Sequence, residues 1–224
     1  VKIQRDTITV KSVEGWIKDA KDIEGIKTAD KSGKIGYIRL TQFGDSTNQD
    51  WISLVNKLDL ERQKMKDFKG VILDLRNNPG GYLNDAIFIS SEFLKIGTPV
   101  VIEENGKGIK NTRWASRVGL LNDAKLVILI NKGSASASEI VAGAMRDHKR
   151  AILVGEKSFG KGTIQQSDDL GNGAGLHVTI AKWLTPNGTW VHGEGLKPDI
   201  EVAIDSKDQS HDLQLEKAVL ELLK

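Results

Sequence analysis

Short apolar runs that alternate with helical segments constrain the fold of this chain more than any other feature. Residues 70–75 read Gly-Val-Ile-Leu-Asp-Leu, residues 126–130 read Leu-Val-Ile-Leu-Ile, and residues 151–154 read Ala-Ile-Leu-Val. Apolar runs of this length are typical of strands that are buried on both sides. Residues 45–68, in contrast, carry their apolar side chains at helical spacing. The sequence therefore predicts an α/β core in which helices cover both faces of a sheet.

The remaining segments extend this pattern. Further strands are expected at residues 1–13, 35–40, 99–103, 163–165 and 176–184, and further helices at residues 83–94, 136–148 and 208–224. Residues 14–34 are charged and low in large apolar side chains, so we expect a loop or linker there. The later strands lie close together in the sequence, which favours an antiparallel or mixed extension of the sheet. The chain accordingly divides into an N-terminal segment of strands and linker (1–34), a core (35–204) and a C-terminal helix (205–224).

Composition excludes several classes of function. The 224 residues include 32 basic and 30 acidic side chains, a net charge of +2 that gives no sign of a nucleic-acid-binding surface. The chain has no cysteine, which removes disulfides, thiolate metal sites and a cysteine nucleophile together. No run of about 18 apolar residues is present, as a transmembrane helix would require. Because the first residue is Val1 and not Met, we expect a fragment of a longer protein.

Two turns that each join a buried strand to a helix have the composition of reactive sites. The first is Asn-Asn-Pro-Gly-Gly at residues 77–81, where the glycines allow the main chain to approach a ligand and the helix N-terminus favours an anion. An ordinary βα turn explains the same residues about equally well. Neither the dinucleotide-binding fingerprint nor the P-loop pattern is present, so phosphate binding is a weaker alternative.

The second turn carries three serines, Ser134, Ser136 and Ser138. Ser136 and Glu139 match a capping box, in which a serine and a glutamate satisfy the first N–H groups of a helix. Nucleophilic serines also occupy strand-to-helix turns, because the helix N-terminus stabilises a developing oxyanion. The spacing alone does not choose among the three serines.

A serine nucleophile needs a base, and Lys161 has the most distinctive setting. It stands between two glycines, with Phe159 and Ile164 nearby to exclude water. An apolar environment disfavours the ammonium form, and a neutral amine can accept the serine proton. In an extended chain Gln165 shares the side of Lys161, whereas Gln166 points away. The alternative is an exposed lysine in a glycine-rich turn. The other candidates are His148, His177, His192 and His211, none of which has a distinctive setting.

Four ordered motifs together resemble the C-terminal processing peptidases, or tail-specific proteases. They are residues 75–81 (Leu-Arg-Asn-Asn-Pro-Gly-Gly), 133–139 (Gly-Ser-Ala-Ser-Ala-Ser-Glu), 159–162 (Phe-Gly-Lys-Gly) and 195–199 (Gly-Leu-Lys-Pro-Asp). The resemblance extends over residues 6–202. It implies a crotonase- or Clp-like α/β core of stacked ββα units with a mixed sheet.

The resemblance also implies the roles of the site residues. Ser136 would be the nucleophile, Lys161 the general base and Gln165 the third catalytic residue, with the N–H groups of Gly81 and Ala137 forming the oxyanion hole. The implied activity is that of a serine endopeptidase that cuts precursor or unfolded proteins near a free, apolar C-terminus through an acyl-enzyme. No metal or organic cofactor is implied, and the sequence does not predict an oligomeric state.

Family members act outside the cytoplasm, in the periplasm, cell envelope or thylakoid lumen. They typically carry a signal or membrane anchor and a PDZ domain before the core. Only residues 1–5 resemble the end of such a domain, so one alternative is a catalytically silent peptide-binding fragment whose site is misaligned without its PDZ domain. A second alternative is an acyl-CoA enzyme on the same fold, for which a serine and a lysine at these positions have no use.

Overall fold

A six-stranded mixed sheet forms the centre of the molecule. The computed structural model describes residues 11–27, 32–204, 208 and 210–224. The strand order is β1-β2-β3-β6-β7-β10. These strands are β1 (Val13–Asp19), β2 (Lys34–Leu40), β3 (Phe68–Asp74), β6 (Leu126–Ile130), β7 (Ile152–Gly155) and β10 (Ile200–Glu201). Only β1 is antiparallel to its neighbour, and the other pairs are parallel.

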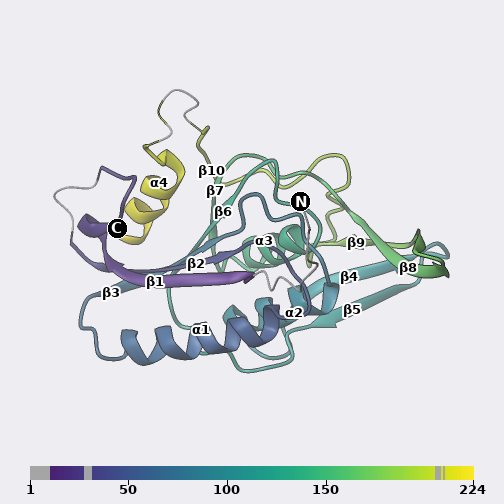
Figure 1. The fold of residues 1–224 in the computed structure, drawn as a ribbon, viewed down its shortest axis with the longest axis horizontal. Helices are drawn as coiled ribbons and strands as arrows, with labels where there is room; N and C mark the ends of the chain where they lie inside the picture. Colours follow the sequence, from purple (N-terminus) through teal and green to yellow (C-terminus); the bar gives the residue numbers. More distant parts are fainter. Residues whose placement is uncertain (1–10, 28–31, 205–207, 209) are drawn as a thin grey trace, which may run out of the picture.

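Helices cover both faces of this sheet, as the apolar runs predict (Figure 1). The helices α1 (Thr47–Arg62), α2 (Leu83–Phe93) and α3 (Ala137–Asp147) pack on one face, and α4 (Leu213–Leu222) packs on the other. Successive residues of β6 point to opposite faces. Ile128 and Ile130 therefore join the core beneath α1–α3, whereas Val127 and Leu129 join the core beneath α4.

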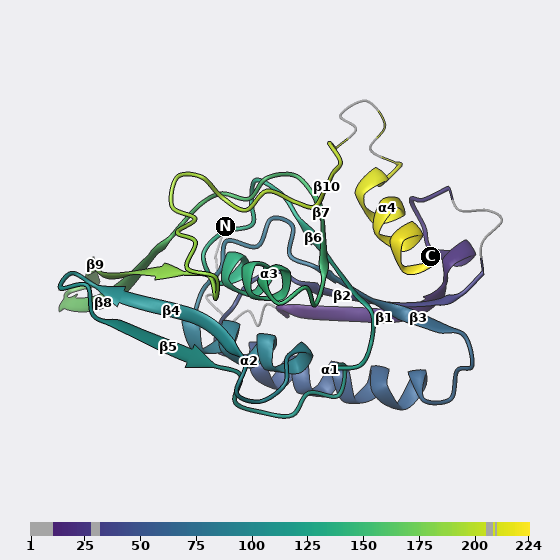
Figure 2. The same cartoon turned by 180° about the vertical axis from the view of Figure 1, so that it is seen from behind.

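A second, four-stranded antiparallel sheet extends from one end of the molecule. Its order is β5-β4-β9-β8. The strands are β4 (Pro99–Asn105), β5 (Lys110–Trp114), β8 (Thr163–Gly171) and β9 (Ala174–Leu184). The β8–β9 hairpin reaches beyond the helices in both ribbon views (Figures 1 and 2). Since β8 pairs only with β9 among the described strands, its outer edge is unpaired.

Most predicted elements are confirmed, and the expected α/β architecture with a mixed sheet is correct. The loop expected over residues 14–34 is wrong in its first part, because β1 occupies Val13–Asp19 and the 3-10 helix η1 follows at Ala20–Asp22. Trp16 of β1 stacks on Tyr37 of β2 with ring centroids 4.8 Å apart, so one aromatic contact compensates for the sparse apolar pattern. The strands β5 and β10 were not predicted, and β8 is longer than expected.

Two of the expected segments lie partly or wholly outside the described residues. The strand predicted over residues 1–13 lies outside them except for its last three residues, and Val13 begins β1. The predicted end of a PDZ domain at residues 1–5 lies wholly outside. The helix predicted at residues 45–68 is shorter, and the division into three segments stays a prediction.

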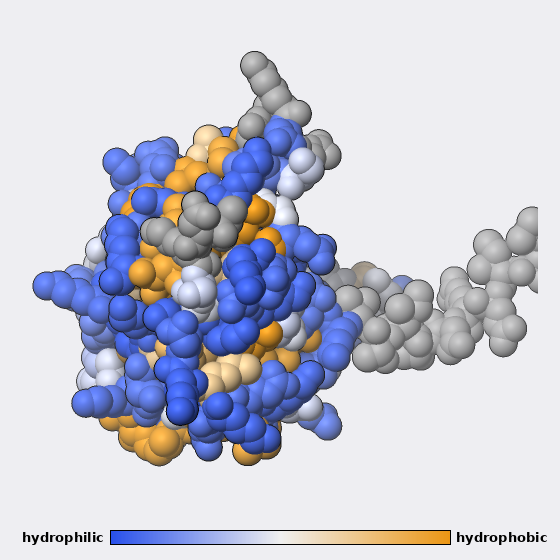
Figure 3. Space-filling model, turned by 90° about the vertical axis from the view of Figure 1, so that its left-hand side faces the viewer, coloured by the Kyte–Doolittle hydropathy of each residue, from blue (hydrophilic) through white to orange (hydrophobic). Residues whose placement is uncertain are grey.

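The end of the molecule opposite the hairpin is mostly hydrophilic, with separate hydrophobic patches (Figure 3). Within the described ranges, no helix combines the length and the apolar composition needed to cross a membrane.

Candidate active site

All five residues proposed from the sequence line one cavity of about 310 Å³ between the two strand-to-helix turns and the β8–β9 hairpin. Gly81 comes from the turn before α2, and Ser136 and Ala137 come from the turn before α3. Lys161 and Gln165 come from the loop before β8 and from β8 itself. The other lining residues are Tyr82, Leu83, Ile140, Thr163, Ile164, Ser167, His177 and Trp183. Residues far apart in the sequence thus meet at the C-terminal ends of β3 and β6.

Ser136 has a strained backbone. Its φ of 55° and ψ of −115° lie in a region that side-chain-bearing residues rarely adopt. Such conformations are often found at functional sites, where the surrounding structure holds them in place. Ser136 is half-buried and faces the cavity.

The other two serines of the turn have structural partners. The Ser134 hydroxyl donates to the Leu75 carbonyl at 2.8 Å, and the Ser138 hydroxyl donates to the Asn78 carbonyl at 2.9 Å. Both side chains are fully buried, and neither lines the cavity. The structure therefore separates three serines that the sequence left equivalent, and only Ser136 is available to a substrate.

Buried asparagines fix the two turns to each other. Asn78 is fully buried, and its side chain donates to the Leu40 carbonyl at 2.8 Å and accepts from the Gly80 N–H at 2.9 Å. The Asn131 side chain accepts from the Asn77 N–H at 2.8 Å and donates to the Asn77 side chain at 2.9 Å. These bonds set the distance between the N-termini of α2 and α3.

The backbone N–H groups of Gly81 and Ala137 both lie in the cavity, and neither has an acceptor in the described part of the chain. Gly81 has a φ of 140°, and a Cβ at this position would lie 1.8 Å from the Phe43 carbonyl oxygen. A Cβ on Gly80 would lie 2.7 Å from the Ala135 carbonyl oxygen. The glycines therefore allow the first turn to pack directly on the serine turn, which brings both N–H groups to one place.

A buried carboxylate joins the turn that carries Ser136 to the loop that carries Lys161. Glu139 is fully buried, and its Oε2 accepts from the N–H groups of Ser136 at 2.8 Å and Lys161 at 2.9 Å. Its Oε1 accepts from the Ser158 hydroxyl at 2.5 Å and the Gly160 N–H at 2.7 Å. Sequence reasoning found only the bond to Ser136, as part of the capping box. The contacts of Glu139 with Ser158, Gly160 and Lys161 join residues about 20 positions apart, so no local sequence pattern predicts them.

The main chain on both sides of Lys161 is held by tryptophans. The Trp183 indole donates to the Lys161 carbonyl and the Trp190 indole donates to the Gly162 carbonyl, each at 2.9 Å. The Lys161 side chain is half-buried, and its amine has no hydrogen bond or ion pair with any described residue. Phe159 was expected to cover this lysine, and that expectation is wrong because 64% of its surface is exposed. Ile164 does line the cavity.

Gln165 faces the cavity, and no hydrogen bond joins its side chain to Lys161 in the described structure. The pairing of β8 with β9 shifts by one residue between Ile164 and Gln165. This irregularity lets consecutive residues line the cavity, whereas Gln166 donates to Asp168 at 3.2 Å outside it. Of the four histidines, only His177 lines the cavity.

A buried ionic network lies next to the turn at residues 76–81. Asp74 at the end of β3 is fully buried, and it accepts from the Tyr37 hydroxyl at 2.8 Å and the Arg76 guanidinium at 2.6 Å. Arg76 also binds Asp212, the N-cap residue of α4, at 2.9 Å. Burial and the charge of Asp74 raise the pKa of Tyr37. The Arg76–Asp212 ion pair thereby connects the N-terminus of α4 to the first residue of the turn at residues 76–81.

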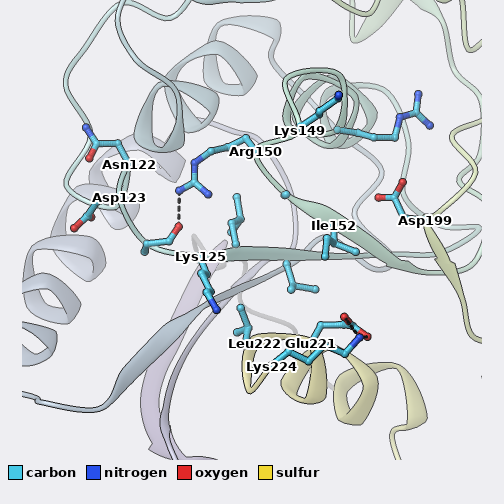
Figure 4. Close-up of a pocket in the computed structure, with 15 residues that line it drawn as sticks. Asn122, Asp123, Lys125, Lys149, Arg150, Ile152, Asp199, Glu221, Leu222 and Lys224 are labelled. Carbon is cyan, nitrogen blue, oxygen red and sulfur yellow. Dashed lines mark hydrogen bonds and ion pairs between the residues drawn. The ribbon is translucent and has the colours of Figure 1, made fainter.

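A second cavity, of about 760 Å³, lies at the opposite ends of β6 and β7 (Figure 4). Arg150 enters it and donates to the carbonyls of Leu121 and Ala124 at 3.0 and 2.7 Å. Glu221 binds Lys217 and Lys224. The basic residues there follow the C-termini of α3 and α4, where cations are stabilised by the helix dipole. These contacts account for the charged side chains of Arg150 and Glu221. No serine is among the described residues that line this cavity.

No three described His, Cys, Asp or Glu side chains form a group that could hold a metal ion.

Comparisons with known proteins agree on one family. The model of peptidase family S41 matches residues 34–202. The chain is 36% identical over 204 residues to a probable CtpA-like serine protease of Staphylococcus epidermidis, covering 91% of this chain and 38% of that protein. It is 39% identical over 218 residues to a carboxy-terminal-processing protease of Bartonella bacilliformis, covering 96% and 46%. The structure matches the photosystem II D1 C-terminal processing protease with a TM-score of 0.74 and 30% identity, covering 98% of this chain and 54% of the other. The chain thus spans less than half the length of the two bacterial relatives.

Proposed function

Because the chain belongs to peptidase family S41, we propose that it is a serine endopeptidase that cleaves precursor or unfolded proteins near their C-terminus. The observation that carries the proposal is the arrangement of one cavity. A strained serine, a lysine amine without a partner and two free backbone N–H groups line it together. These are the groups that acyl transfer requires: a nucleophile, a base and an oxyanion hole.

In the proposed mechanism, the Ser136 Oγ attacks the scissile carbonyl while the neutral Lys161 amine accepts its proton. The N–H groups of Gly81 and Ala137 donate to the oxyanion of the tetrahedral intermediate. The C–N bond then breaks, and the Lys161 ammonium returns its proton to the leaving amine. Water hydrolyses the resulting acyl-enzyme by the same steps in reverse, with Lys161 again as the base. Gln165 is assigned the role of orienting the amine.

The walls of the cavity favour an extended, apolar substrate. Its apolar lining residues are Leu83, Ile140, Ile164 and Trp183. They provide a site for an apolar side chain beside the scissile bond. The unpaired edge of β8 begins two residues after Lys161, so a peptide can add to the sheet there and reach Ser136. The partner is thus a protein or peptide with a free, apolar C-terminus, and the chemistry requires no cofactor.

We place this activity outside the cytoplasm, in the periplasm or cell envelope, by the resemblance described above. Members of the family typically carry a PDZ domain that gates the site. Anchoring to a membrane and gating by a PDZ domain would both involve segments outside the described residues.

Cleavage of an unfolded reporter protein with an apolar C-terminus tests the catalytic assignment. We expect the parent chain to cut and both Ser136→Ala and Lys161→Ala to lose at least about a hundredfold in kcat, the scale of losing a nucleophile or base. Lys157→Ala is the matched control, since Lys157 is exposed on the same loop.

Three results would count against the assignment. Cleavage by Ser136→Ala at the parent rate removes Ser136 from the mechanism. A parent chain that binds the reporter but does not cut it, also when it is joined to a PDZ domain, favours the alternative of a silent peptide-binding fragment. Stable binding of a coenzyme A thioester would instead favour an acyl-CoA enzyme.

A further inference from the structure

Two buried oxygen atoms close to the turn that carries Gly81 have no hydrogen-bond partner. They are Asn48 Oδ1, in the first turn of α1, and Asp85 Oδ2, in the first turn of α2. Among the described residues, the only other buried side-chain atom without a partner is Ser90 Oγ. Folded proteins leave few buried polar atoms unsatisfied. Two such oxygens on neighbouring helices therefore need an explanation.

The two oxygens belong to side chains that one hydrogen bond already joins. The Asn48 Nδ2 donates to the Asp85 Oδ1 at 2.9 Å. An ionised carboxylate can only accept, so it offers no donor to the Asn48 carbonyl oxygen. A protonated carboxyl has one O–H group, and a proton on Asp85 Oδ2 supplies the donor that Asn48 Oδ1 lacks. One proton thus satisfies both oxygens and completes a two-bond pair between an acid and an amide.

The surroundings of Asp85 favour the protonated form. Only 6% of its surface is exposed. Burial raises the pKa of Asp85, the hydrogen bond from Asn48 lowers it and the like charge of Asp45 raises it, with a net increase. Tyr82, in the turn before α2, is the other titratable group that interacts with this carboxyl. Among the described residues, α3 and β4 also pack on α2 and contribute no charged group to this site.

The N-terminus of α2 favours the ionised form, but its N–H groups do not bind the carboxylate. An acid at this position of a helix often accepts from the N–H of the N-cap residue. Here the N-cap is Tyr82, and its N–H donates to the Phe43 carbonyl at 3.3 Å. The Arg113 guanidinium donates to the neighbouring Asn84 at 2.9 Å and not to Asp85. The effect of the helix dipole alone is smaller than the cost of two unsatisfied buried oxygens.

The acid–amide pair lies next to a main-chain contact that holds the turn at residues 80–82. Phe43, just before α1, forms an isolated parallel bridge with Gly81, and its N–H donates to the Gly80 carbonyl at 2.9 Å. Asn48 follows Phe43 by five residues, and Asp85 follows Gly81 by four. The same two segments are therefore joined twice, once through the main chain and once through the pair.

Loss of the proton would weaken the second of these contacts. Asn48 Oδ1 would lose its donor, and the Asp85 carboxylate would repel the carboxylate of Asp45, which accepts from the Tyr82 hydroxyl. Both effects push the segment before α1 away from the turn before α2. The N–H of Gly81 lies on that turn, so its position depends on the pair.

We propose that the Asp85 carboxyl carries a proton in the folded protein, donates it to Asn48 Oδ1, and thereby positions the turn at residues 80–82. Asp85 is then a positioning residue, because it acts on the reaction through the Gly81 N–H. The effect on catalysis rests on the proposed function, whereas the protonation of the carboxyl does not depend on it.

Infrared difference spectroscopy of the parent chain against Asp85→Asn tests the protonation directly. We expect the C=O band of a protonated carboxyl at about pH 5.5, where an exposed Asp, with a pKa of about 3.9, is almost fully ionised. Asp50→Asn is the matched control and should show no such band, because Asp50 is in the same turn of α1 as Asn48 and accepts from the Ser46 hydroxyl. Carboxylate bands alone for Asp85 at this pH reject the inference.

Thermal unfolding of Asp85→Asn gives an independent measure. The Asn amide offers one donor and one acceptor to Asn48, so it keeps both bonds of the pair at every pH. The stabilisation by Asp85 is fully present below the usual pKa of about 3.9 and is lost as the pH rises through the raised value in the folded state. We expect equal Tm values at about pH 4 and an advantage of Asp85→Asn that grows until the infrared band disappears. A Tm of Asp85→Asn below that of the parent throughout rejects the inference.

Cleavage of the unfolded reporter tests the positioning role. We expect Asp85→Asn to keep kcat within about twofold and Asp85→Ala to lower it about tenfold with little change in KM, because the oxyanion donor is displaced. Above the pH at which the band disappears, Asp85→Asn should have a higher kcat than the parent. Parent-like kcat in Asp85→Ala, or a kcat of Asp85→Asn that never exceeds the parent's, rejects the role. The band and the Tm trend without cleavage by any chain leave the pair standing and reject the peptidase function instead.

Discussion

The carboxylate of Glu139 holds the main chain of Ser136 and the main chain of Lys161 to one point. Each of its two oxygens accepts two hydrogen bonds, and the four donors come from both segments of the site. Reacting groups that are misplaced by about 1 Å can lose a hundredfold in rate. In the proposed mechanism Glu139 is thus a positioning residue, because it acts through the main chain of the segments that carry Ser136 and Lys161.

Glu139→Gln tests this role. The substitution replaces one acceptor oxygen by an NH₂ group that faces two donors. Leaving two buried donors unsatisfied should lower the free energy of unfolding by at least about 2 kcal/mol. We also expect kcat to fall on the order of a hundredfold. Glu156→Gln is the matched control, because Glu156 pairs with the exposed Lys132 at 3.4 Å and is not part of the site. Normal kcat in a folded Glu139→Gln chain would contradict the positioning role.

At the scale of the element, the turn before α2 depends on the absence of a side chain at Gly81. A methyl group there would meet the Phe43 carbonyl oxygen, so Gly81→Ala must move the turn and its N–H group. We expect Gly81→Ala to lower kcat by about 10²- to 10³-fold, which is the effect of losing one oxyanion donor. Gly106→Ala is the control, because a Cβ at Gly106 meets no atom within 4 Å. Parent-like kcat in Gly81→Ala would remove Gly81 from the oxyanion hole.

The C-terminal helix α4 should contribute stability that depends on pH. Burial by itself raises the pKa of Asp212, but the hydrogen bonds and charge of Arg76 outweigh it and the pKa is lowered. The stabilisation is therefore fully present above the usual pKa of Asp, about 3.9, and is lost as the pH falls through the lowered value in the folded state. Asp212→Asn keeps a capping oxygen for the Leu215 N–H and removes the charge.

We expect the Tm of Asp212→Asn to lie below that of the parent at pH 7, with a difference that narrows as the pH approaches about 3. Thermal unfolding followed by circular dichroism measures it. Asp169→Asn, a change on the exposed hairpin, should show no such trend. A difference that is constant from pH 7 to pH 3 would mean that the Arg76 ion pair does not stabilise α4.

The elements that the sequence predicts well are those whose signal is local. The runs that became β3 and β6 are mostly apolar because both faces are covered, and the capping box at Ser136 lies within four residues. β1 was missed because it is held by pairing with β2 along its whole length and by contacts such as the Trp16–Tyr37 stack, which join residues about 20 positions apart. The choice among the serines likewise depends on carbonyls about 60 residues away, Leu75 and Asn78. Such contacts are set by the tertiary structure and leave no periodic pattern.

At the scale of the whole molecule, the two sheets should differ in local stability. The central strands are buried on both faces, whereas residues 165–180 of the β8–β9 hairpin are exposed and pair mainly with each other. Few buried apolar contacts mean a low free energy of local opening. We expect hydrogen exchange in β8 to be at least about a hundredfold faster than in β3 and β6.

Exchange followed by mass spectrometry measures this difference, with the amides of β6 as the internal reference. Adding an extended peptide with an apolar C-terminus to the Ser136→Ala chain should slow exchange in β8 and leave β6 unchanged. Uniform protection across both sheets would show that the hairpin is as stable as the core.

The left-handed backbone at Ser136 has an evolutionary consequence. A φ of 55° costs a serine on the order of 1 kcal/mol and costs a glycine little. In the proposed mechanism, a mutation of this codon to one for glycine would relieve the backbone strain and abolish activity. Folding alone would favour that replacement, and a role as the nucleophile would oppose it. The proposed function thus predicts that selection for activity keeps a serine at a position where the backbone favours glycine.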